Sequence, residues 1–86
     1  MQVIFHKSFD KQYIKLSPKI HSRFEERLKI FLTSPFAPLL NNHSVDEIFP
    51  ECRSINITGD YRAIFKMRDS IPVFIKIGTH HELYGK

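Results

Sequence analysis

The sequence predicts a single α+β domain, in which an N-terminal strand and a two-helix hairpin pack on an antiparallel sheet of three further strands, followed by a polar C-terminal tail. In the first half of the chain, apolar residues recur at helical spacing. Between residues 53 and 77, three segments rich in β-branched and aromatic residues alternate with turn sequences. The length of 86 residues is enough for one domain with a modest hydrophobic core.

The N-terminal part predicts one strand and one short helix. Gln2–His6 alternates enough to form the first strand. Ser8 suits the N-cap of a helix from Phe9 to about Leu16, because a serine hydroxyl accepts a hydrogen bond from a free N–H of the first turn. These two elements lead into the second helix.

A second, longer helix begins at Ser17 and Pro18, a pair typical of the N-cap and of the first helical position. Pro35 and Pro38 end it, since proline lacks the N–H that a helix interior needs. Residues 39–50 are expected to be an irregular connection. The helix face expected to lie on the sheet carries Ile20, Phe24, Leu28, Phe31 and Leu32.

Three strands are predicted at Arg53–Ile57, Tyr61–Met67 and Ile71–Ile77, with turns at 58–60 and 68–70. Side chains alternate between the two faces of a strand, so each strand has one apolar face. In the last strand, the apolar face is expected to carry Ile71, Val73, Ile75 and Ile77, and the other face Pro72, Phe74 and Lys76.

The register follows if both turns are three-residue loops. Ile55 then lies opposite Ala63, Asn56 opposite Arg62, and Arg62 opposite Lys76. A two-residue first turn would put Asn56 on the apolar face, and we reject it for that reason. The prediction is a polar row of Asn56, Arg62 and Lys76 on the face away from the core. Two adjacent cations repel each other and favour a bound anion, although solvated basic side chains explain the row equally well.

Composition narrows the classes of function. The net charge of +4 favours a nucleic acid or an acidic protein as partner, although many small proteins of this charge bind neither. No apolar run is long enough to span a membrane, and no signal peptide is recognisable, so we expect a cytoplasmic protein. The lone Cys52 agrees with a reducing compartment and is expected to be a half-buried strand residue. No metal-ligand spacing or glycine-rich phosphate loop is present.

Two segments carry a resemblance to a known family. TGDYRAIFKM and IKIGTHHELYG resemble the RelE/ParE superfamily of bacterial toxins, and most of all its YafQ-like branch. The match covers roughly Asn41 to Gly85. The resemblance implies a RelE-like fold and the toxin of a type II toxin–antitoxin system, neutralised by a cognate antitoxin protein. It also implies cleavage of mRNA in the ribosomal A site, by attack of the RNA's own 2′-OH, without metal or cofactor.

This reaction needs a base for the 2′-OH, positive charge near the phosphate and an acid for the leaving oxygen, and histidine suits both proton transfers. The resemblance implies that the catalytic residues are His80, Arg62, Lys76, His43, Asp60 and Tyr84. Those implied to contact RNA are Tyr61, Asn56, His81 and Lys66.

The chain departs from the YafQ-like pattern at two positions. Lys76 stands where those toxins have an arginine, so it keeps the charge but not the planar fork. Asn56 stands where they have a histidine, and asparagine transfers no proton at neutral pH. If that histidine is the base, this chain uses His43, His80 or His81 instead, or it has lost about 10²–10⁴-fold in rate.

Two further functions are therefore carried as alternatives. One is a ParE-like protein that inhibits gyrase without cutting RNA, or a decayed toxin that only binds its antitoxin. The other is a small RNA-binding domain without toxicity. The histidine-rich tail favours the nuclease, and Asn56 favours the first alternative.

Overall fold

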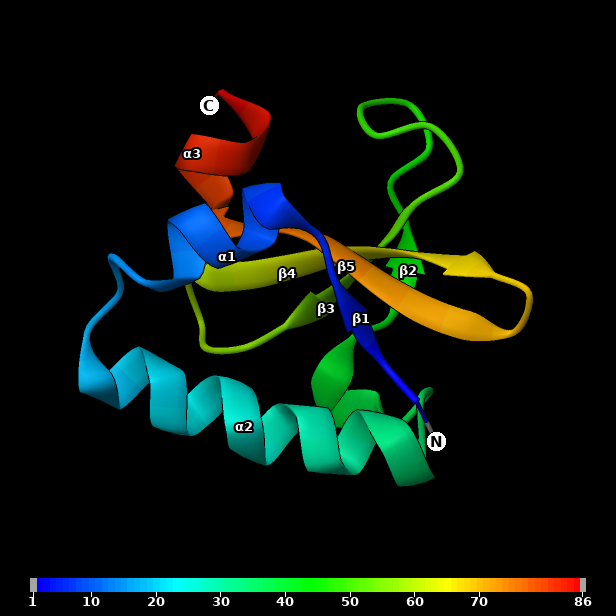
Figure 1. The fold of residues 1–86 in the computed structure, drawn as a ribbon, viewed down its shortest axis with the longest axis horizontal. Coiled ribbons are helices and arrows are strands. Elements are labelled where there is room, and N and C mark those ends of the chain that lie inside the picture. Colours follow the sequence, from blue (N-terminus) through cyan, green and yellow to red (C-terminus); the bar gives the residue numbers. More distant parts are fainter. Residues whose placement is uncertain (1, 86) are drawn as a thin grey trace.

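The computed structural model describes residues 2–85, which form a five-stranded mixed sheet covered by helices on both faces (Figure 1). The elements in chain order are β1 (Ile4–Phe5), α1 (Lys7–Tyr13), α2 (Pro18–Thr33), the 3₁₀ turn η1 (Pro38–Leu40), β2 (His43–Ser44), β3 (Arg53–Asn56), β4 (Tyr61–Arg68), β5 (Ile71–Thr79) and α3 (His80–Tyr84). The predicted α+β class is confirmed. No helix within residues 2–85 is both long and apolar enough to cross a membrane.

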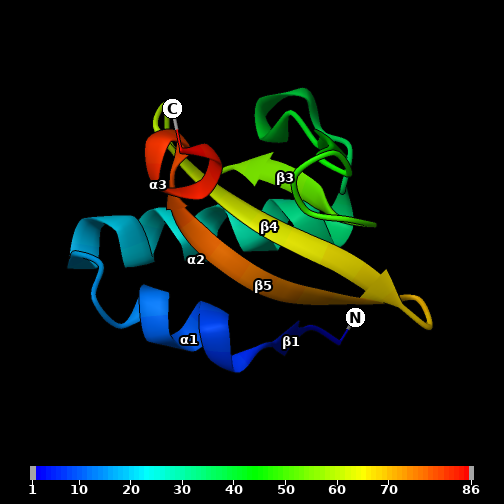
Figure 2. The same ribbon diagram turned by 90° about the horizontal axis from the view of Figure 1, so that it is seen from above.

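The strands lie in the order β1-β5-β4-β3-β2, and Figure 2 shows the first four side by side. β1 runs parallel to β5, and every other pair is antiparallel. We predicted a sheet of three strands with the N-terminal strand packed on it, and the structure has one sheet of five strands. β1 joins this sheet, and β2 arises within the connection predicted to be irregular. β2 forms because His43 and Ser44 pair with Ser54 and Arg53 of β3.

Both predicted helices are present. In α2 the hydroxyl of Ser17 accepts a hydrogen bond from the Ile20 N–H at 3.3 Å, and the helix ends at Thr33, as predicted. The predicted bounds of α1 were wrong at both ends: it begins two residues earlier, because the ring of His6, not Ser8, supplies the N-cap, and it ends at Tyr13 instead of about Leu16. Ser8 instead donates its hydroxyl proton to the carbonyl oxygen of Ile75 and so ties α1 to β5.

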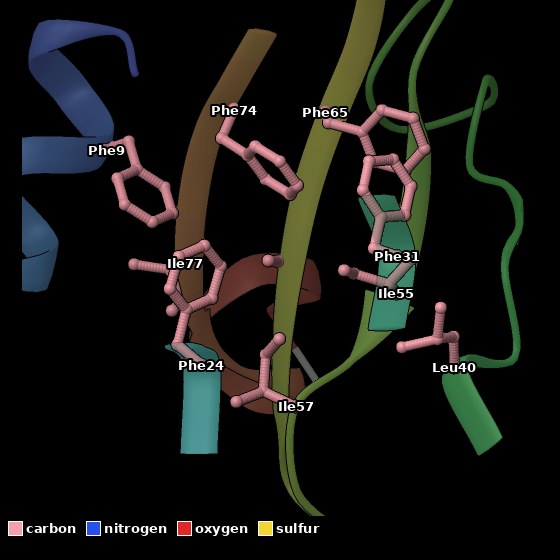
Figure 3. Close-up of a cluster of buried hydrophobic side chains, with 10 residues drawn as sticks. Phe9, Phe24, Phe31, Leu40, Ile55, Ile57, Phe65, Phe74 and Ile77 are labelled. Atoms are coloured by element: carbon pink, nitrogen blue, oxygen red, sulfur yellow. The ribbon is translucent and has the colours of Figure 1, made fainter. Parts of the chain in front are cut away.

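The main core lies between the sheet and the two helices α1 and α2. Its centre is the ring of Phe74, which packs against Phe9 of α1, Phe24 and Phe31 of α2, and Phe65 of β4, with ring centroids 5.4 to 6.0 Å apart (Figure 3). All five rings are 3% exposed or less. The aromatic packing therefore fills the space between this face of the sheet and the two helices.

A smaller apolar cluster lies on the opposite face of the sheet, which we call the far face. Its buried members are Cys52, Ile64 of β4 and Leu83 of α3, and Phe49 and Tyr84 pack against them. Cys52 was expected to be a half-buried strand residue; it is 4% exposed and lies directly before β3. Burial raises the pKa of its thiol, because a thiolate is poorly solvated there.

The register of β3 on β4 is confirmed, with Ile55 opposite Ala63 and Asn56 opposite Arg62. The predicted register of β4 on β5 is wrong. The hairpin turns at Asp69 and Ser70 alone, both with positive φ, and Arg68 pairs with Ile71. A two-residue turn with φ above zero at both positions matches the twist of the flanking strands better than the three-residue loop that we predicted.

A β-bulge then changes which side chains of β5 face the core. Phe65 pairs with Phe74, but Ile64 pairs with Lys76, so Ile75 is the extra residue. The predicted alternation is broken: Phe74 and Ile77 face the helices, and Ile75 packs on the far face. Lys76 lies opposite Ile64, and Gly78 lies opposite Arg62, so the straight row of Asn56, Arg62 and Lys76 is wrong.

The C-terminal segment, predicted only as a polar tail, forms the helix α3. The Thr79 hydroxyl accepts a hydrogen bond from the Glu82 N–H (3.1 Å), and the Glu82 carboxylate accepts one from the Thr79 N–H (2.8 Å). This capping box fixes the start of the helix at His80. Gly85 ends it with φ 70°, a conformation that glycine adopts readily.

Candidate active site

An open groove lies on the far face, between α3 and the loop that follows β2. Figure 1 shows both segments rising from the same side of the sheet, opposite α2. The groove has a volume of about 570 Å³. Its lining residues are His43, Ser44, Val45, Asp46, Glu47, Ile48, His80 and Tyr84. Three of these are predicted site residues, from segments far apart in the sequence.

α3 places His80 and Tyr84 on one side of the groove. Residues four apart on a helix share a face, and here the two rings meet edge to face with centroids 4.6 Å apart. The backbone N–H of His80 donates a hydrogen bond to the carbonyl oxygen of Asp60 at 3.0 Å, which ties the start of the helix to the β3–β4 turn. The Tyr84 ring is supported from behind by Phe49, at 6.2 Å. His80 is thus exposed but held in place.

His43 occupies the opposite side, on the edge strand β2. Its Nδ1 lies 2.7 Å from the carbonyl oxygen of Asn41. A carbonyl oxygen only accepts hydrogen bonds, so Nδ1 carries the proton and, in the neutral ring, Nε2 keeps its lone pair. This tautomer makes Nε2 a proton acceptor.

Arg62 and Asn56 form a half-buried polar pair on the neighbouring strands. Nη1 of Arg62 donates to the carbonyl oxygens of Thr58 (3.0 Å) and Tyr61 (3.1 Å). Among the described residues, only Nη1 of this guanidinium has a partner, so the remaining donors are available to an anion. Oδ1 of Asn56 is buried and has no hydrogen-bond partner within residues 2–85.

The other predicted residues do not line the groove. Lys76 is half-buried opposite Ile64, and Asp60 is exposed in the β3–β4 turn. Tyr61 packs against the helix-side core, and Lys66 lines a separate hollow. His81 is exposed on α3.

Sequence reasoning missed five lining residues, Ser44 to Ile48, of which Asp46 and Glu47 bring carboxylates beside the two histidines. Oδ1 of Asp46 accepts a hydrogen bond from the Glu51 N–H at 2.6 Å, so this carboxylate also shapes the loop. The only signal in the sequence was that both follow His43 closely. Carboxylates on the groove wall repel a phosphate, because the two carry charges of the same sign.

No protein-family model matches this chain, and no curated protein matches it. Solved structures do. YafQ from E. coli strain BL21(DE3) is 20% identical, with a TM-score of 0.79 over 98% of each chain. A chain of the RelB–RelE antitoxin–toxin complex from Methanococcus jannaschii is 17% identical, with a TM-score of 0.75 over 96% of each. The YoeB/ParE toxin from Agrobacterium tumefaciens is 16% identical, with a TM-score of 0.75 over 93% of this chain and 99% of that one. The protein therefore has the fold of these toxins, which confirms the resemblance at the level of the fold.

Proposed function

We propose that this protein is the toxin of a type II toxin–antitoxin pair and a ribosome-dependent endoribonuclease that cuts mRNA in the A site. The observation that carries the proposal is one groove, on a toxin fold, with a histidine on each side. The relatives named above support the toxin class. The reaction itself rests on the chemistry of the groove residues.

The reaction breaks the P–O5′ bond by attack of the adjacent 2′-oxygen. A base removes the 2′-OH proton, the 2′-oxygen bonds to phosphorus, and the 5′-oxygen leaves with a proton from an acid. The products are a 2′,3′-cyclic phosphate and a 5′-OH. We assign the base to His43, whose Nε2 is a proton acceptor, and the acid to His80 across the groove. In this assignment the base that Asn56 does not supply comes from the edge strand β2.

Positive charge and stacking complete the proposed site. Arg62 meets the phosphate with the donors that the backbone leaves unused, and Lys76 adds a point charge beside it. Tyr84 orients the RNA, since an aromatic ring stacks on an unpaired base. Asn56 positions the substrate by hydrogen bonding, with His81, Lys66 and Asp60 as outer contacts. Tyr61 packs against the helix-side core and is assigned no contact with RNA. The net charge of +4 suits both the ribosome and an acidic antitoxin as partners.

The assignment of acid and base is tested with ribosomes carrying a synthetic mRNA. Both His43→Ala and His80→Ala are expected to slow cleavage by about 10²–10⁴-fold. A second mRNA has sulfur in place of the bridging 5′-oxygen, and its leaving group needs no acid. The His80→Ala variant is expected to cleave this second mRNA, and the His43→Ala variant is not. Rescue of His43→Ala instead would reverse the two roles, and rescue of neither would remove His80 from the acid role.

A second function is kept for two reasons: Asn56 stands where the family resemblance implies a histidine, and Asp46 and Glu47 place negative charge on the groove wall. Both oppose phosphate chemistry and favour a ParE-like inhibitor of gyrase, or a protein that only binds its antitoxin. Inducing the chain in bacteria separates these outcomes. Breaks in the DNA with intact mRNA indicate the gyrase inhibitor, and normal growth indicates a binder alone.

A further inference from the structure

A second concavity on the far face is separate from the groove. We call it the far-face hollow; its volume is about 380 Å³. Its apolar floor is formed by Ile4, Val73, Ile75 and Cys52, and its cations are Lys66 and Arg68. Among the described residues that line it, none is an aspartate or a glutamate. The proposed reaction uses only Lys66 of these residues, as an outer contact, so the hollow as a whole has no assigned role.

The chemistry of the hollow indicates what it binds. Lys66 and Arg68 lie two residues apart on β4, so both project from the same face, above Val73 and Ile75 of β5. Ile4 remains 47% exposed, which is unusual for an aliphatic side chain beside other apolar ones. The surface therefore pairs two cations with an aliphatic floor. Two rings also line it, but both are already engaged: His6 caps α1 through Ser8, and Phe49 packs against Tyr84. The floor therefore offers mainly aliphatic contacts, which suit a peptide better than the unpaired bases of RNA, since these are held by stacking.

The edge of the sheet is also open at this place. β1 is the end strand of the sheet among residues 2–85, and it is two residues long. Its outer backbone groups are available to a further strand. An extended peptide that pairs with this edge presents alternate side chains to the face where Ile4 lies.

We propose that the far-face hollow docks an extended segment of a partner protein in which aliphatic residues alternate with Asp or Glu. The aliphatic side chains occupy the floor, and the carboxylates meet Lys66 and Arg68. Identifying this partner as the antitoxin rests on the proposed function. The docking itself does not depend on RNA cleavage.

The hollow shares a wall with the groove, which gives the docking a consequence. Residues 45–52 form a loop whose ends close on each other, since the Val45 N–H donates to the carbonyl oxygen of Cys52 at 3.0 Å. Val45 to Ile48 line the groove, and Phe49, Pro50 and Cys52 line the hollow. The ring of Phe49 also supports Tyr84. A segment in the hollow therefore contacts the same loop that shapes the groove, without covering His80.

The test uses the full chain without RNA or ribosomes, so its outcome is independent of nuclease activity. The probe is a fluorescein-labelled peptide in which Glu alternates with Leu and Val, and the control peptide has Lys in place of Glu. Fluorescence anisotropy is expected to show binding of the acidic peptide only. Arg68→Glu is expected to weaken binding about tenfold or more, because it replaces an attractive contact with a repulsive one. Lys19→Glu, an exposed change of the same charge on α2, is expected to leave the affinity unchanged.

Amide chemical shifts locate the peptide, and circular dichroism verifies that Arg68→Glu is folded. The proposal predicts shifts at β1, at the Arg68 end of β4 and in the loop 45–52. It is overturned if the acidic peptide does not bind, if Arg68→Glu binds it as well as the wild type, or if the shifts lie in the groove alone. Self-association of the chain through these residues, or equal shifts with a single-stranded RNA, would also overturn it.

Discussion

One contact orients each of the two histidines to which we assign proton transfer. The carbonyl oxygen of Asn41 fixes the tautomer of His43, and the ring of Tyr84 fixes the orientation of His80. Neither contact is visible in the sequence, where His43 was a loop histidine with no assigned neighbour. The sequence did identify both histidines, because the GTH-x-x-LY-G ending and the loop position carry the resemblance. It did not indicate that they face each other.

A prediction at this scale concerns the buried thiol. Burial raises the pKa of Cys52, so the folded state keeps a proton that the unfolded state loses above its ordinary pKa of about 8.5. The contribution of Cys52 to the free energy of unfolding is therefore constant below that pH and falls as the pH rises above it. Urea unfolding at a series of pH values measures this loss.

Cys52→Ala is the matched control, because it removes the thiol and with it the loss of stability above about pH 8.5. The pKa of Tyr13 is also raised by burial and by Glu25, and it causes a similar loss at higher pH. Introducing Tyr13→Phe into both the wild type and the Cys52→Ala variant removes that second effect. An identical pH dependence with and without Cys52 would contradict the account.

At the scale of elements, α3 shows how a short helix is held. It has five residues, too few to be stable alone, and it depends on the capping box at Thr79 and Glu82 and on the burial of Leu83. The sequence contained the box as Thr79 followed three residues later by glutamate. We interpreted that segment as a polar tail because only Leu83 and Tyr84 are apolar there. A capping signal without an apolar run is easily overlooked.

Removing the cap is expected to disturb the site more than the fold. Thr79→Ala loses the hydroxyl that accepts from the Glu82 N–H, which costs about 1 kcal/mol. Because His80 is the first residue of the helix, its position loosens. We expect faster hydrogen exchange at Glu82 and lower activity, with the free energy of unfolding lowered by no more than about 1 kcal/mol.

Thr79→Ser is the matched control, since serine keeps the hydroxyl and serves equally well as an N-cap. It is expected to retain slow exchange and activity. If Thr79→Ala leaves exchange at Glu82 unchanged, the capping box does not hold α3.

The bulge in β5 is the element that sequence reasoning missed most completely. Ile71, Val73, Ile75 and Ile77 alternate without interruption, and nothing in that pattern marks an extra residue. The bulge is favoured by packing, because it turns both Phe74 and Ile77 toward the helices. It also removes Lys76 from the position opposite Arg62. Tertiary packing here outweighs the local pattern.

At the scale of the whole molecule, the aromatic core positions everything else. Phe74 contacts rings from α1, α2 and β4, so it joins both helices to the sheet. The helical spacing of Phe24 and Phe31 predicted the α2 part of this core. The role of Phe74 was not predicted, since the expected register placed it on the opposite face.

Phe74→Ala is expected to cost about 3–5 kcal/mol, because the cavity is surrounded by rings that cannot close it. Most domains of this size have a free energy of unfolding of about 5–15 kcal/mol, so a large part of the stability is lost. Phe36→Ala is the control, since Phe36 is 69% exposed and its loss is expected to change stability by less than about 0.5 kcal/mol. Urea unfolding compares the two, and equal losses would contradict the assigned core.

The central claim, that the groove cuts translated mRNA, is tested most directly by mapping mRNA ends after induction. Wild type, His80→Ala and Arg23→Ala are expressed side by side; Arg23 is exposed on α2, away from the groove. The account predicts growth arrest with cuts inside reading frames for wild type and Arg23→Ala, and intact mRNA for folded His80→Ala. Arrest with intact mRNA in the wild type, or cleavage that persists in His80→Ala, would contradict it.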